Sequence, residues 1–508
     1  MTFAWSLFLI YLAGTAWLGW QGYKRTTGFG SFAVGNRAMN PVVVGITLAA
    51  SVSSASTFII NPGFVYVDGF SAFFHMSIAV AIGFFAMLVT LSFQFRRIGA
   101  EAAALTIPDW IGKRYESKSF ALFFSVLNLL SFAFVVLLVG GISIVMQSLL
   151  GVSNEVALCI TLVFVTGYVF IGGTNAHVLT NMLQGSLMIV VTILVLGSCA
   201  WVAMQQPVSV VESLRTIDAN LVAAVNREGR LFNDVFSIYV AGFIVGAVVV
   251  CQPHILTKAL YVKDDRAVRQ YLGVFAVIFL LFQMLGLVGF FAHLAVPPDA
   301  MVDATTGQFR QDLVMTQYLA TLFPPWVFTI VGVVLLAAAM STLDGLLVSI
   351  STITANDLVL NLVERRAHHS EEQQMAMALK ASHVMLVVIA VAAFLVNLQP
   401  PKLLGIFGQV GVYGLTAAAA PPLLLGVLFR RVPVVLVWVG SIAAITLHFL
   451  LFFKGSAMFP QSGLTFANPG VTVSLATLAV LPLMLVIAWW LNRELPDDAA
   501  EGGESLTK

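Results

Sequence analysis

Long apolar segments recur along almost the whole chain, and they constrain its fold more than any other feature. The hydrocarbon core of a bilayer is about 30 Å thick, so a helix needs roughly 20 apolar residues to cross it. We count thirteen such segments, at residues 3–21, 41–66, 71–93, 119–150, 155–173, 181–204, 235–253, 271–296, 325–360, 381–398, 403–428, 433–453 and 470–491. The sequence therefore predicts an all-α, polytopic membrane protein with about 13 transmembrane helices.

The composition leaves no room for a large soluble domain. Hydrophobic residues make up 59% of the chain and charged residues 10%, whereas about a quarter of residues are charged in soluble domains. The net charge of +1 gives no reason to expect nucleic acid as a partner. Cys159, Cys199 and Cys251 all fall in apolar segments, so we expect buried free thiols. The first segment lacks a basic start, so we expect a span there and not a removed signal peptide.

The basic residues predict how the chain is oriented. The loops that follow odd-numbered segments hold 19 of the 25 Lys and Arg residues. Because cytoplasmic loops are enriched in these residues, we expect the N-terminus outside and the C-terminus in the cytoplasm. Two outer loops are long, 205–234 and 297–324. The first mixes apolar and charged residues, which fits short helices over the outer mouth as well as it fits a solvated loop.

Residues 337–345 place two hydroxyls and a carboxylate inside the apolar segment 326–350, which has no other ionisable residue. A carboxylate at membrane depth costs several kcal/mol unless it is paired or coordinates an ion. Asp344 is therefore a candidate functional residue.

The second apolar segment is interrupted by polar residues. Five hydroxyl side chains fall within residues 51–57, and Pro62-Gly63 follows. Ser and Thr offer the backbone alternative hydrogen bonds, and unwound backbone at this depth is tolerated where it lines a cavity. The pattern favours either a broken helix or close helix packing through small residues.

Broken helices are typical of secondary transporters built from inverted repeats. Repeats that start at the second and seventh segments would have five helices each and opposite orientations. In the seventh segment, Gly242, Gly246 and then Gln252-Pro253 could cause a corresponding break. The predicted division is an extra helix and cytoplasmic loop (1–40), a first repeat (41–204), an outer loop (205–234), a second repeat (235–428), two C-terminal helices (429–491) and a cytoplasmic tail (492–508).

At these residues the chain resembles the sodium:solute symporter family over nearly its whole length, and most of all its bacterial sodium/pantothenate branch. The resemblance rests on residues 54–58 with Pro62-Gly63, 106–111 with Arg114-Tyr115, 171–173 with Gln184, and 338–342, and for the branch on 178–185, 216–218 and 252–254. It implies a five-plus-five inverted-repeat core similar to that of the leucine transporter. It also implies sodium-coupled import of a solute across a bacterial-type inner membrane.

The resemblance further implies a sodium site between the first broken helix and the ninth segment. Its ligands would be the carbonyls of Ala50, Ser53 and Ala338 and the hydroxyls of Ser341 and Thr342. Residues i, i+3 and i+4 share one helix face, so three of these five neutral oxygens can converge. The alternative is that the small residues serve helix packing.

At two positions the chain departs from the family pattern for a second cation-binding site. Relatives that couple a second sodium have an acidic residue where this chain has Asn181, and a hydroxyl where it has Asp344. Three possibilities stay open for Asp344. It forms a modified cation site with Asn181 and Ser341, or it carries a proton, or it is inert and hydrogen-bonded.

Four residues are candidates for substrate binding. Ser54 and Thr57 fall where relatives face their substrate, and the free N–H groups at the start of the outer half-helix would favour a carboxylate. His75 and Gln409 are the next polar groups in segments expected to line the cavity. For each of these two, an interhelical hydrogen bond is the alternative. Asn128 and Gln283 are assigned to packing.

We expect a sodium-driven symporter that imports a small organic solute by alternating access and functions as a monomer in the bilayer. The solute is expected to be a carboxylate, such as pantothenate, another monocarboxylate or an amino acid. The alternatives are proton coupling through Asp344 and a transport-dead receptor or regulator. The sequence has no HExxH or paired-Asp motif and no nucleophile with a plausible base, which argues against an enzyme.

Overall fold

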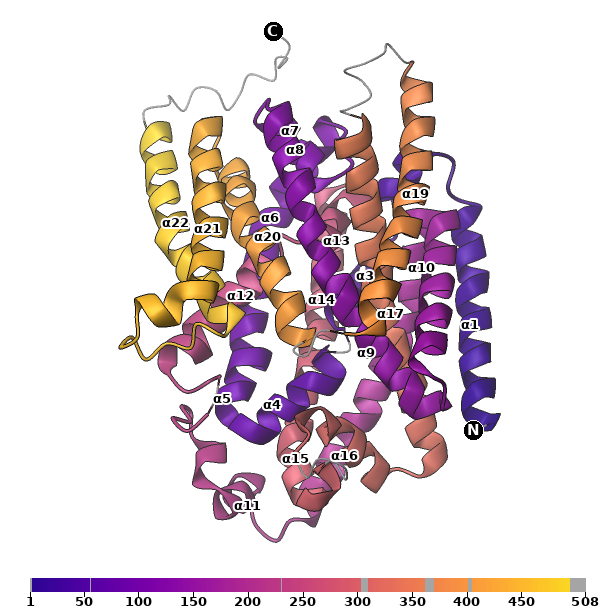
Figure 1. The fold of residues 1–508 in the computed structure, drawn as a ribbon, viewed down its shortest axis with the longest axis vertical. Coiled ribbons are helices and arrows are strands. Elements are labelled where there is room, and N and C mark those ends of the chain that lie inside the picture. Colours follow the sequence, from indigo (N-terminus) through magenta and orange to yellow (C-terminus); the bar gives the residue numbers. More distant parts are fainter. Residues whose placement is uncertain are drawn as a thin grey trace.

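The computed structural model describes residues 2–54, 56–229, 231–302, 309–360, 370–400 and 404–493. In these ranges the chain is helical, apart from an isolated β-bridge between Val302 and Phe309. The long helices run side by side, and short helices gather at one end of the molecule (Figure 1). The prediction of an all-α fold is confirmed.

The helices fall into a longer and a shorter group, and several of the shorter ones form part of a candidate span. The longer helices are α1 (Thr2–Tyr23), α6 (Val80–Glu101), α9 (Phe132–Leu150), α10 (Asn154–Gln205), α14 (Asp265–Gln283), α17 (Pro325–Ile353), α19 (Glu371–Leu398), α20 (Leu404–Leu428), α21 (Val434–Met458) and α22 (Pro469–Asn492). The shorter helices are α2 (Phe29–Val34), α3 (Pro41–Val52), α4 (Asn61–Asp68), α5 (Phe70–Phe73), α7 (Ile107–Arg114), α8 (Lys118–Leu127), α11 (Val210–Ile217), α12 (Ala241–Val249), α13 (Pro253–Leu256), α15 (Val288–Ala295) and α16 (Val314–Leu322).

Ten helices in the described ranges are long and apolar enough to cross a membrane, and two bent pairs bring the number to as many as twelve. α10 has 52 residues and contains a non-helical residue, Gly173, with φ 50°. A straight helix of that length would measure ~78 Å, more than twice the thickness of the hydrocarbon core. The bend at Gly173 lies between the fifth and sixth predicted segments. The count of thirteen stays a prediction.

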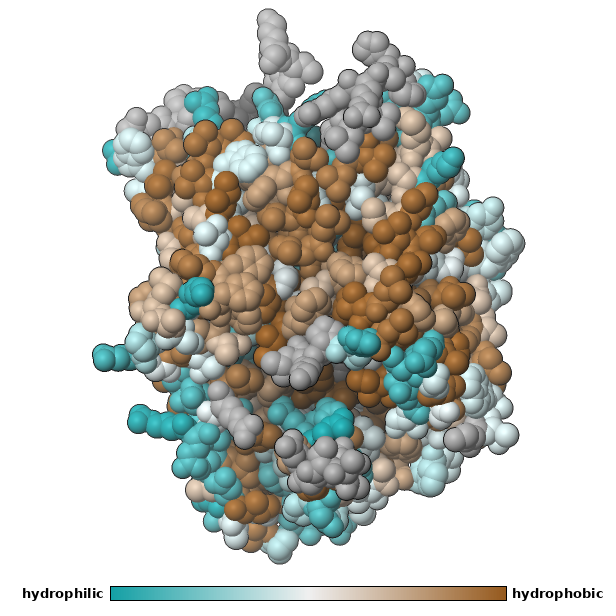
Figure 2. Space-filling model, in the orientation of Figure 1, coloured by the Kyte–Doolittle hydropathy of each residue, from teal (hydrophilic) through white to brown (hydrophobic). Residues whose placement is uncertain are grey.

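The surface matches a membrane environment. A broad hydrophobic band crosses the face seen in Figure 2, and hydrophilic residues gather toward its two ends. Large exposed apolar side chains such as Trp17, Val163 and Trp489 lie on the long helices α1, α10 and α22. Cys159 is exposed too, so the expectation of a buried thiol is wrong for it, while Cys199 and Cys251 are buried.

Two helices are bent at the places where the predicted repeats begin. The first pair, α3 and the helical stretch Ser56–Asp68, meets at 58°. The second pair, Phe236–Val249 and Pro253–Tyr261, meets at 66°. Proline lacks an N–H group and suits the first turn of a helix, which explains why α13 starts at Pro253.

Gly242 and Gly246 have a different role from the one expected, because both lie inside α12 and not at the break. A Cβ on Gly246 would lie 2.0 Å from the carbonyl oxygen of Val80, and one on Gly242 would lie 2.8 Å from the Cβ of Ala79. These glycines therefore let α12 approach α6 closely. The expected interruption falls at Gln252-Pro253.

Loop residues brace the ends of the bundle. Residues 205–234 include the short helix α11, whose Leu214 packs against Val65 and Phe232 in one buried cluster. At the opposite end, Arg114 donates hydrogen bonds to the carbonyls of Gly426, Phe429 and Arg430, which holds the turn between α20 and α21.

The two ends of the described chain lie on opposite sides of the bundle. α1 begins at the end where α11 and α16 lie, and α22 finishes at the other end (Figure 1). The first residues thus share a side with both long loops that were expected outside. Which side faces the cytoplasm stays the prediction from the Lys and Arg distribution.

Replacing Gly246 with Ala should destabilise the protein, because the new methyl group meets the backbone of α6. Overpacking of this kind costs about 1–3 kcal/mol. Gly273, in the interior of α14, has no atom within 4 Å of its would-be Cβ. Gly273→Ala should therefore be neutral or stabilise by about 0.5–1 kcal/mol through helix propensity. Unfolding in detergent measures both, and equal stability of the two variants would contradict the packing role of Gly246.

Candidate functional site

The break of the first bent helix lies against the middle of α17. The hydroxyl of Ser341 is 2.9 Å from the carbonyl oxygen of Ala50 and 2.7 Å from that of Ala338. A hydroxyl has one proton to donate, so Ser341 can donate to only one of these two carbonyls at a time. All three residues are fully buried. Three neutral oxygens that converge in this way form a place where a cation would be favourable.

Two further hydroxyls near this point have no protein partner. The oxygens of Ser53 and Thr342 are buried and accept or donate no hydrogen bond within the described chain. Such a group costs about 1–3 kcal/mol when left unsatisfied. Of the five oxygens expected from the resemblance, three are thus clustered and that of Thr342 is unpartnered. For Ser53 the unpartnered atom is the hydroxyl oxygen and not the expected carbonyl.

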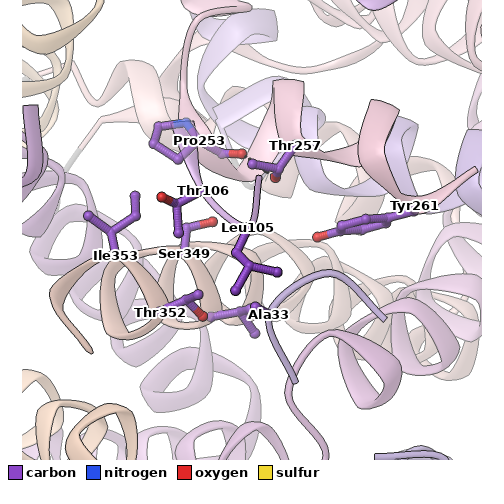
Figure 3. A pocket seen from close by; sticks show the side chains of 10 residues that line it. Ala33, Leu105, Thr106, Pro253, Thr257, Tyr261, Ser349, Thr352 and Ile353 are labelled. Carbon is purple, nitrogen blue, oxygen red and sulfur yellow. Dashed lines mark hydrogen bonds between the residues drawn. The ribbon is translucent and has the colours of Figure 1, made fainter. Parts of the chain in front are cut away.

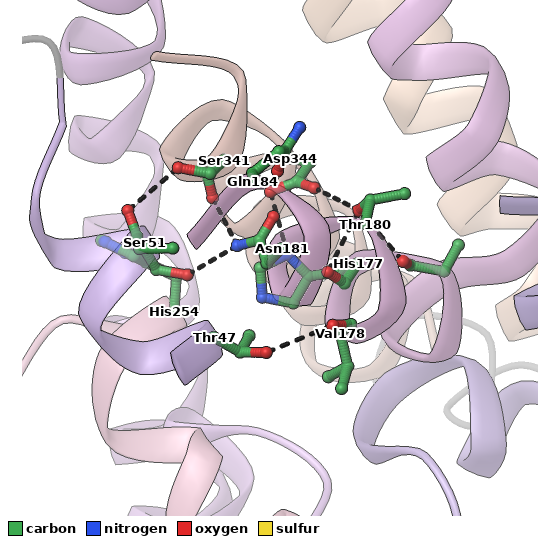
Figure 4. A network of polar contacts seen from close by, with 12 residues as sticks. Thr47, Ser51, His177, Val178, Thr180, Asn181, Gln184, His254, Ser341 and Asp344 are labelled. Carbon is green, nitrogen blue, oxygen red and sulfur yellow. Dashed lines mark hydrogen bonds and ion pairs between the residues drawn. The ribbon is translucent and has the colours of Figure 1, made fainter. Parts of the chain in front are cut away.

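Asn181 connects the two helices of this site to α10. Its side-chain nitrogen donates to the hydroxyl of Ser51 at 3.0 Å and to the carbonyl of Ser341 at 2.8 Å (Figure 4). Its side-chain oxygen has no partner in the described chain. Asn181 therefore ties α3, α10 and α17 together beside the clustered oxygens.

Asp344 belongs to a separate set of contacts. Its carboxylate accepts hydrogen bonds from Tyr168 at 2.9 Å and Thr180 at 3.2 Å, and lies 2.9 Å from Nδ1 of His177. All three partners are on α10, and none is Asn181. The carboxylate is fully buried. These three contacts give the buried carboxylate the hydrogen-bond partners that the sequence alone does not reveal.

Sequence reasoning missed Tyr168, which lies in the apolar segment 155–173, and His177, which lies just before the segment 181–204. His177 lies four residues before Asn181, which puts the two on one face of α10. That spacing was the available signal. Lys258, also buried, donates to the carbonyl of His254 at 2.6 Å and interacts electrostatically with Asp344. The carboxylate thus lies in a neighbourhood that also contains basic groups.

A cavity of about 200 Å³ lies next to the first break and brings together Ser54, Thr57, His75 and Gln409. These are the four residues expected to bind substrate. Five further polar residues line the same cavity and were not predicted for it: Ser56, Asn61, Gln252, Gln283 and Tyr413. No Asp, Glu, Lys or Arg is among its lining residues in the part of the chain that the structure describes.

The start of the outer half-helix is already hydrogen-bonded. The hydroxyl of Ser54 accepts from the backbone N–H of Ser56 at 3.2 Å. Its carbonyl accepts from the N–H groups of Thr57 at 3.0 Å and Phe58 at 3.4 Å. A carboxylate would have to compete with Ser54 for these donors.

Because Nδ1 of His75 is 2.7 Å from the carbonyl of Ser237, that nitrogen carries the proton.

A second cavity near the other break is far smaller. It has a volume of about 10 Å³ and lies between α17 and the segment that contains Pro253, Thr257 and Tyr261 (Figure 3). This is about the space of one water molecule. It cannot hold an organic solute. The cavity at the first break is the candidate for a substrate because the four residues expected to bind substrate line it.

The family model of the sodium:solute symporter family matches residues 32–443. The chain belongs to the sodium:solute symporter family. Members of this family are sodium-coupled transporters, and this member is an integral membrane protein whose bent helices, clustered oxygens and neutral cavity lie within the matched region.

Curated relatives of this symporter include two sodium/pantothenate symporters. The one from Haemophilus influenzae is 30% identical over 436 residues, which cover 84% of each chain. The one from Escherichia coli is 28% identical and the match covers 80% of this chain and 82% of the relative. The sodium/proline symporter of Escherichia coli is 27% identical over 442 residues.

A solved structure shares the fold of this symporter. A Na⁺-coupled sialic acid symporter in a substrate-bound, outward-open state superposes with a TM-score of 0.71. The match covers 95% of this chain and 98% of the other, at 16% sequence identity. The expected inverted-repeat architecture, similar to that of the leucine transporter, is confirmed at the level of fold.

Replacing Asp344 with Ala should strongly destabilise the protein, because three buried groups on α10 would lose their partner. Leaving a buried polar group without its hydrogen-bond partner costs about 1–3 kcal/mol. Asp299 is exposed, and Asp299→Ala should change stability by less than about 0.5 kcal/mol. Thermal unfolding of both variants in one detergent measures the difference. A loss in Asp344→Ala no larger than in Asp299→Ala would contradict the bracing role.

Proposed function

We propose that this protein is a sodium-driven symporter that imports a small organic carboxylate, pantothenate-like or another monocarboxylate or amino acid, by alternating access. The observation that carries the proposal is the cluster of neutral oxygens at the first break, next to a neutral cavity. Family membership supports sodium as the coupling ion. The pantothenate and proline symporters among its relatives support a small acid as the substrate.

The sodium ion would bind where α3 meets α17. The carbonyls of Ala50, Ser53 and Ala338 and the hydroxyls of Ser341 and Thr342 are its proposed ligands. Unwound backbone carbonyls near the midplane coordinate Na⁺ in transporters of this architecture. Binding would give the carbonyls of Ala50 and Ala338, which compete for one hydroxyl proton, a common cation, and it would give the oxygen of Thr342 a partner.

Coupling follows from the position of this ion between two helices. A ligand shifts a conformational equilibrium only as far as it binds the two states unequally. Ala50 is on α3 and Ser341 is on α17, so the proposed ligands converge only when the two helices are in contact. Sodium would therefore favour the state in which α3 and α17 are held together, with Ser54 and Thr57 completing the cavity beside them.

The substrate would occupy the cavity that contains Ser54, Thr57, His75 and Gln409. Its volume of about 200 Å³ is below the range of about 300–1,000 Å³ typical of sites for drug-sized ligands. A small acid is therefore the appropriate size class. The carboxylate of the substrate would accept hydrogen bonds from the backbone N–H groups that are now bonded to Ser54. The dipole at this helix N-terminus would add a favourable interaction.

We assign Asp344 to bracing and not to a second transported cation. Its oxygens already accept from Tyr168, His177 and Thr180, which supports the inert, hydrogen-bonded possibility. Asn181 would position Ser341 from the other side. We further propose that the chain works as a monomer in a bacterial inner membrane, with its N-terminus outside and its C-terminus in the cytoplasm.

Mutating Ser341 and Thr342 together to Ala should abolish sodium-dependent uptake, because two of the five proposed ligands disappear. Ser351→Ala is the matched control, since its buried hydroxyl is on the same helix and bonds the carbonyl of Val348 at 3.1 Å. Uptake into proteoliposomes with a sodium gradient, or with a pH gradient alone, measures the effect. Full sodium activation in the double variant would refute the site, and uptake driven by the pH gradient alone would refute sodium coupling.

The sodium dependence of uptake should have a Hill coefficient of about 1, because one cation site is proposed. Asp344→Asn keeps a side-chain oxygen for the donors on α10 and should leave this coefficient unchanged, although it lowers stability. Initial uptake rates at varied sodium concentration measure it. A coefficient near two that falls in Asp344→Asn would instead show a second cation at Asp344.

A further inference from the structure

Gln252 lies in the break of the second bent helix, just before α13 begins at Pro253. The residue is 4% exposed, and it lines the same cavity as Ser54 and Thr57. The two bent helices therefore each contribute residues from their break to one cavity. Gln252 was noted in the sequence only as part of a motif.

The side chain of Gln252 is poorly satisfied. Its oxygen Oε1 is buried and has no hydrogen-bond partner in the described chain. Its nitrogen Nε2 is 3.4 Å from the carbonyl of Val249, a long hydrogen bond. The terminal amide torsion of Gln is broad, so a small rotation can turn Oε1 toward a donor in the cavity.

The local backbone does not need this side chain. The N–H of Gln252 donates to the carbonyl of Val249 at 3.1 Å, and its carbonyl accepts from Ile255 at 3.0 Å and Leu256 at 3.1 Å. The turn and the start of α13 are thus held by the main chain and by Pro253. An unpaired acceptor at this position has no structural explanation.

Gln283, which lines the same cavity, provides a contrast. Its side-chain nitrogen donates to the backbone carbonyl of Met76 at 2.7 Å, and its backbone carbonyl accepts from the hydroxyl of Ser77 at 2.8 Å. These bonds tie α14 to the helical turn that contains His75. Gln283 is therefore a brace, as the sequence predicted, although it also faces the cavity.

We propose that Gln252 is a specificity-determining residue that accepts a hydrogen bond from an O–H or N–H group of the substrate. The transported acid then carries such a donor in addition to its carboxylate, as hydroxy acids, amino acids and amides of amino acids do. This inference rests on the proposed function and narrows its substrate class. A site with a buried acceptor rejects analogues that lack the donor, because the acceptor stays unpaired.

The test compares acids that differ by one donor. Sodium-dependent uptake of labelled lactate into proteoliposomes is competed with unlabelled lactate against propionate, and with 3-hydroxybutyrate against butyrate. Pantothenate and proline are included as larger acids that carry donors. The variants are Gln252→Met, which keeps the length and removes the acceptor, and Gln283→Met as the matched control. Thermal unfolding confirms that each variant is folded.

In the wild type, the donor-bearing member of a pair should bind about tenfold more tightly or better. Gln252→Met should reduce this preference about tenfold by weakening the donor-bearing acid, with the sodium concentration for half-maximal uptake unchanged. Gln283→Met should keep the preference. Gln252→Glu retains an acceptor of the same length, so it should keep the preference even though both acids bind more weakly beside its charge.

Two results would overturn the proposal in distinguishable ways. If Gln252→Met is folded and keeps the full preference, or if Gln252→Glu loses it, Gln252 does not select the donor, while sodium-driven transport stands. If none of these acids shows sodium-dependent competition in the wild type, the proposed transport of small carboxylates fails, and this inference fails with it.

Discussion

The structure depends on how the interrupted backbone of the first bent helix is satisfied. In a bilayer every backbone polar group needs a partner from the protein, since water is absent there. The side chain and carbonyl of Ser54 cap the outer half-helix, and the hydroxyl of Ser341 contacts the carbonyl of Ala50 on the inner half. The break is therefore stable only while α17 covers it, and this makes the contact between α3 and α17 a natural point of control.

Two of the polar contacts between α10 and α17 show how these helices run. Asn181 bonds the carbonyl of Ser341, and His177 pairs with Asp344. The higher number on α17 goes with the lower number on α10, so the helices run antiparallel here. The spacings, three residues on α17 and four on α10, each amount to about one helical turn. The pair at Asp344 holds α17 in place without using the oxygens around Ser341, which stay available for a cation.

Hydropathy was enough to predict an all-α membrane protein and the polar patch on α17, and hydroxyl content indicated either a break near Ser54 or close packing there. They could not predict the partners of Asp344, because His177 and Tyr168 meet it only through tertiary packing. Cys159 shows a second limit, since an apolar segment is equally compatible with protein and with lipid around it. Gln252 shows a third, because its importance lies in a missing hydrogen bond, and a sequence does not show which side chains are left unpaired.

The neutral character of the cavity gives a physical reason for strict coupling in the proposed cycle. With no Lys or Arg among its described lining residues, a carboxylate that entered alone would be a buried charge without a counterion, which is strongly unfavourable. A sodium ion at the adjacent oxygens would be coordinated, but its proposed ligands are all neutral and leave its charge without a counterion. Together the two charges compensate each other, so the loaded site is close to electroneutral. A positive side chain in this cavity would compensate the carboxylate without sodium. Because the described lining residues include no such side chain, binding of the solute would depend on bound sodium.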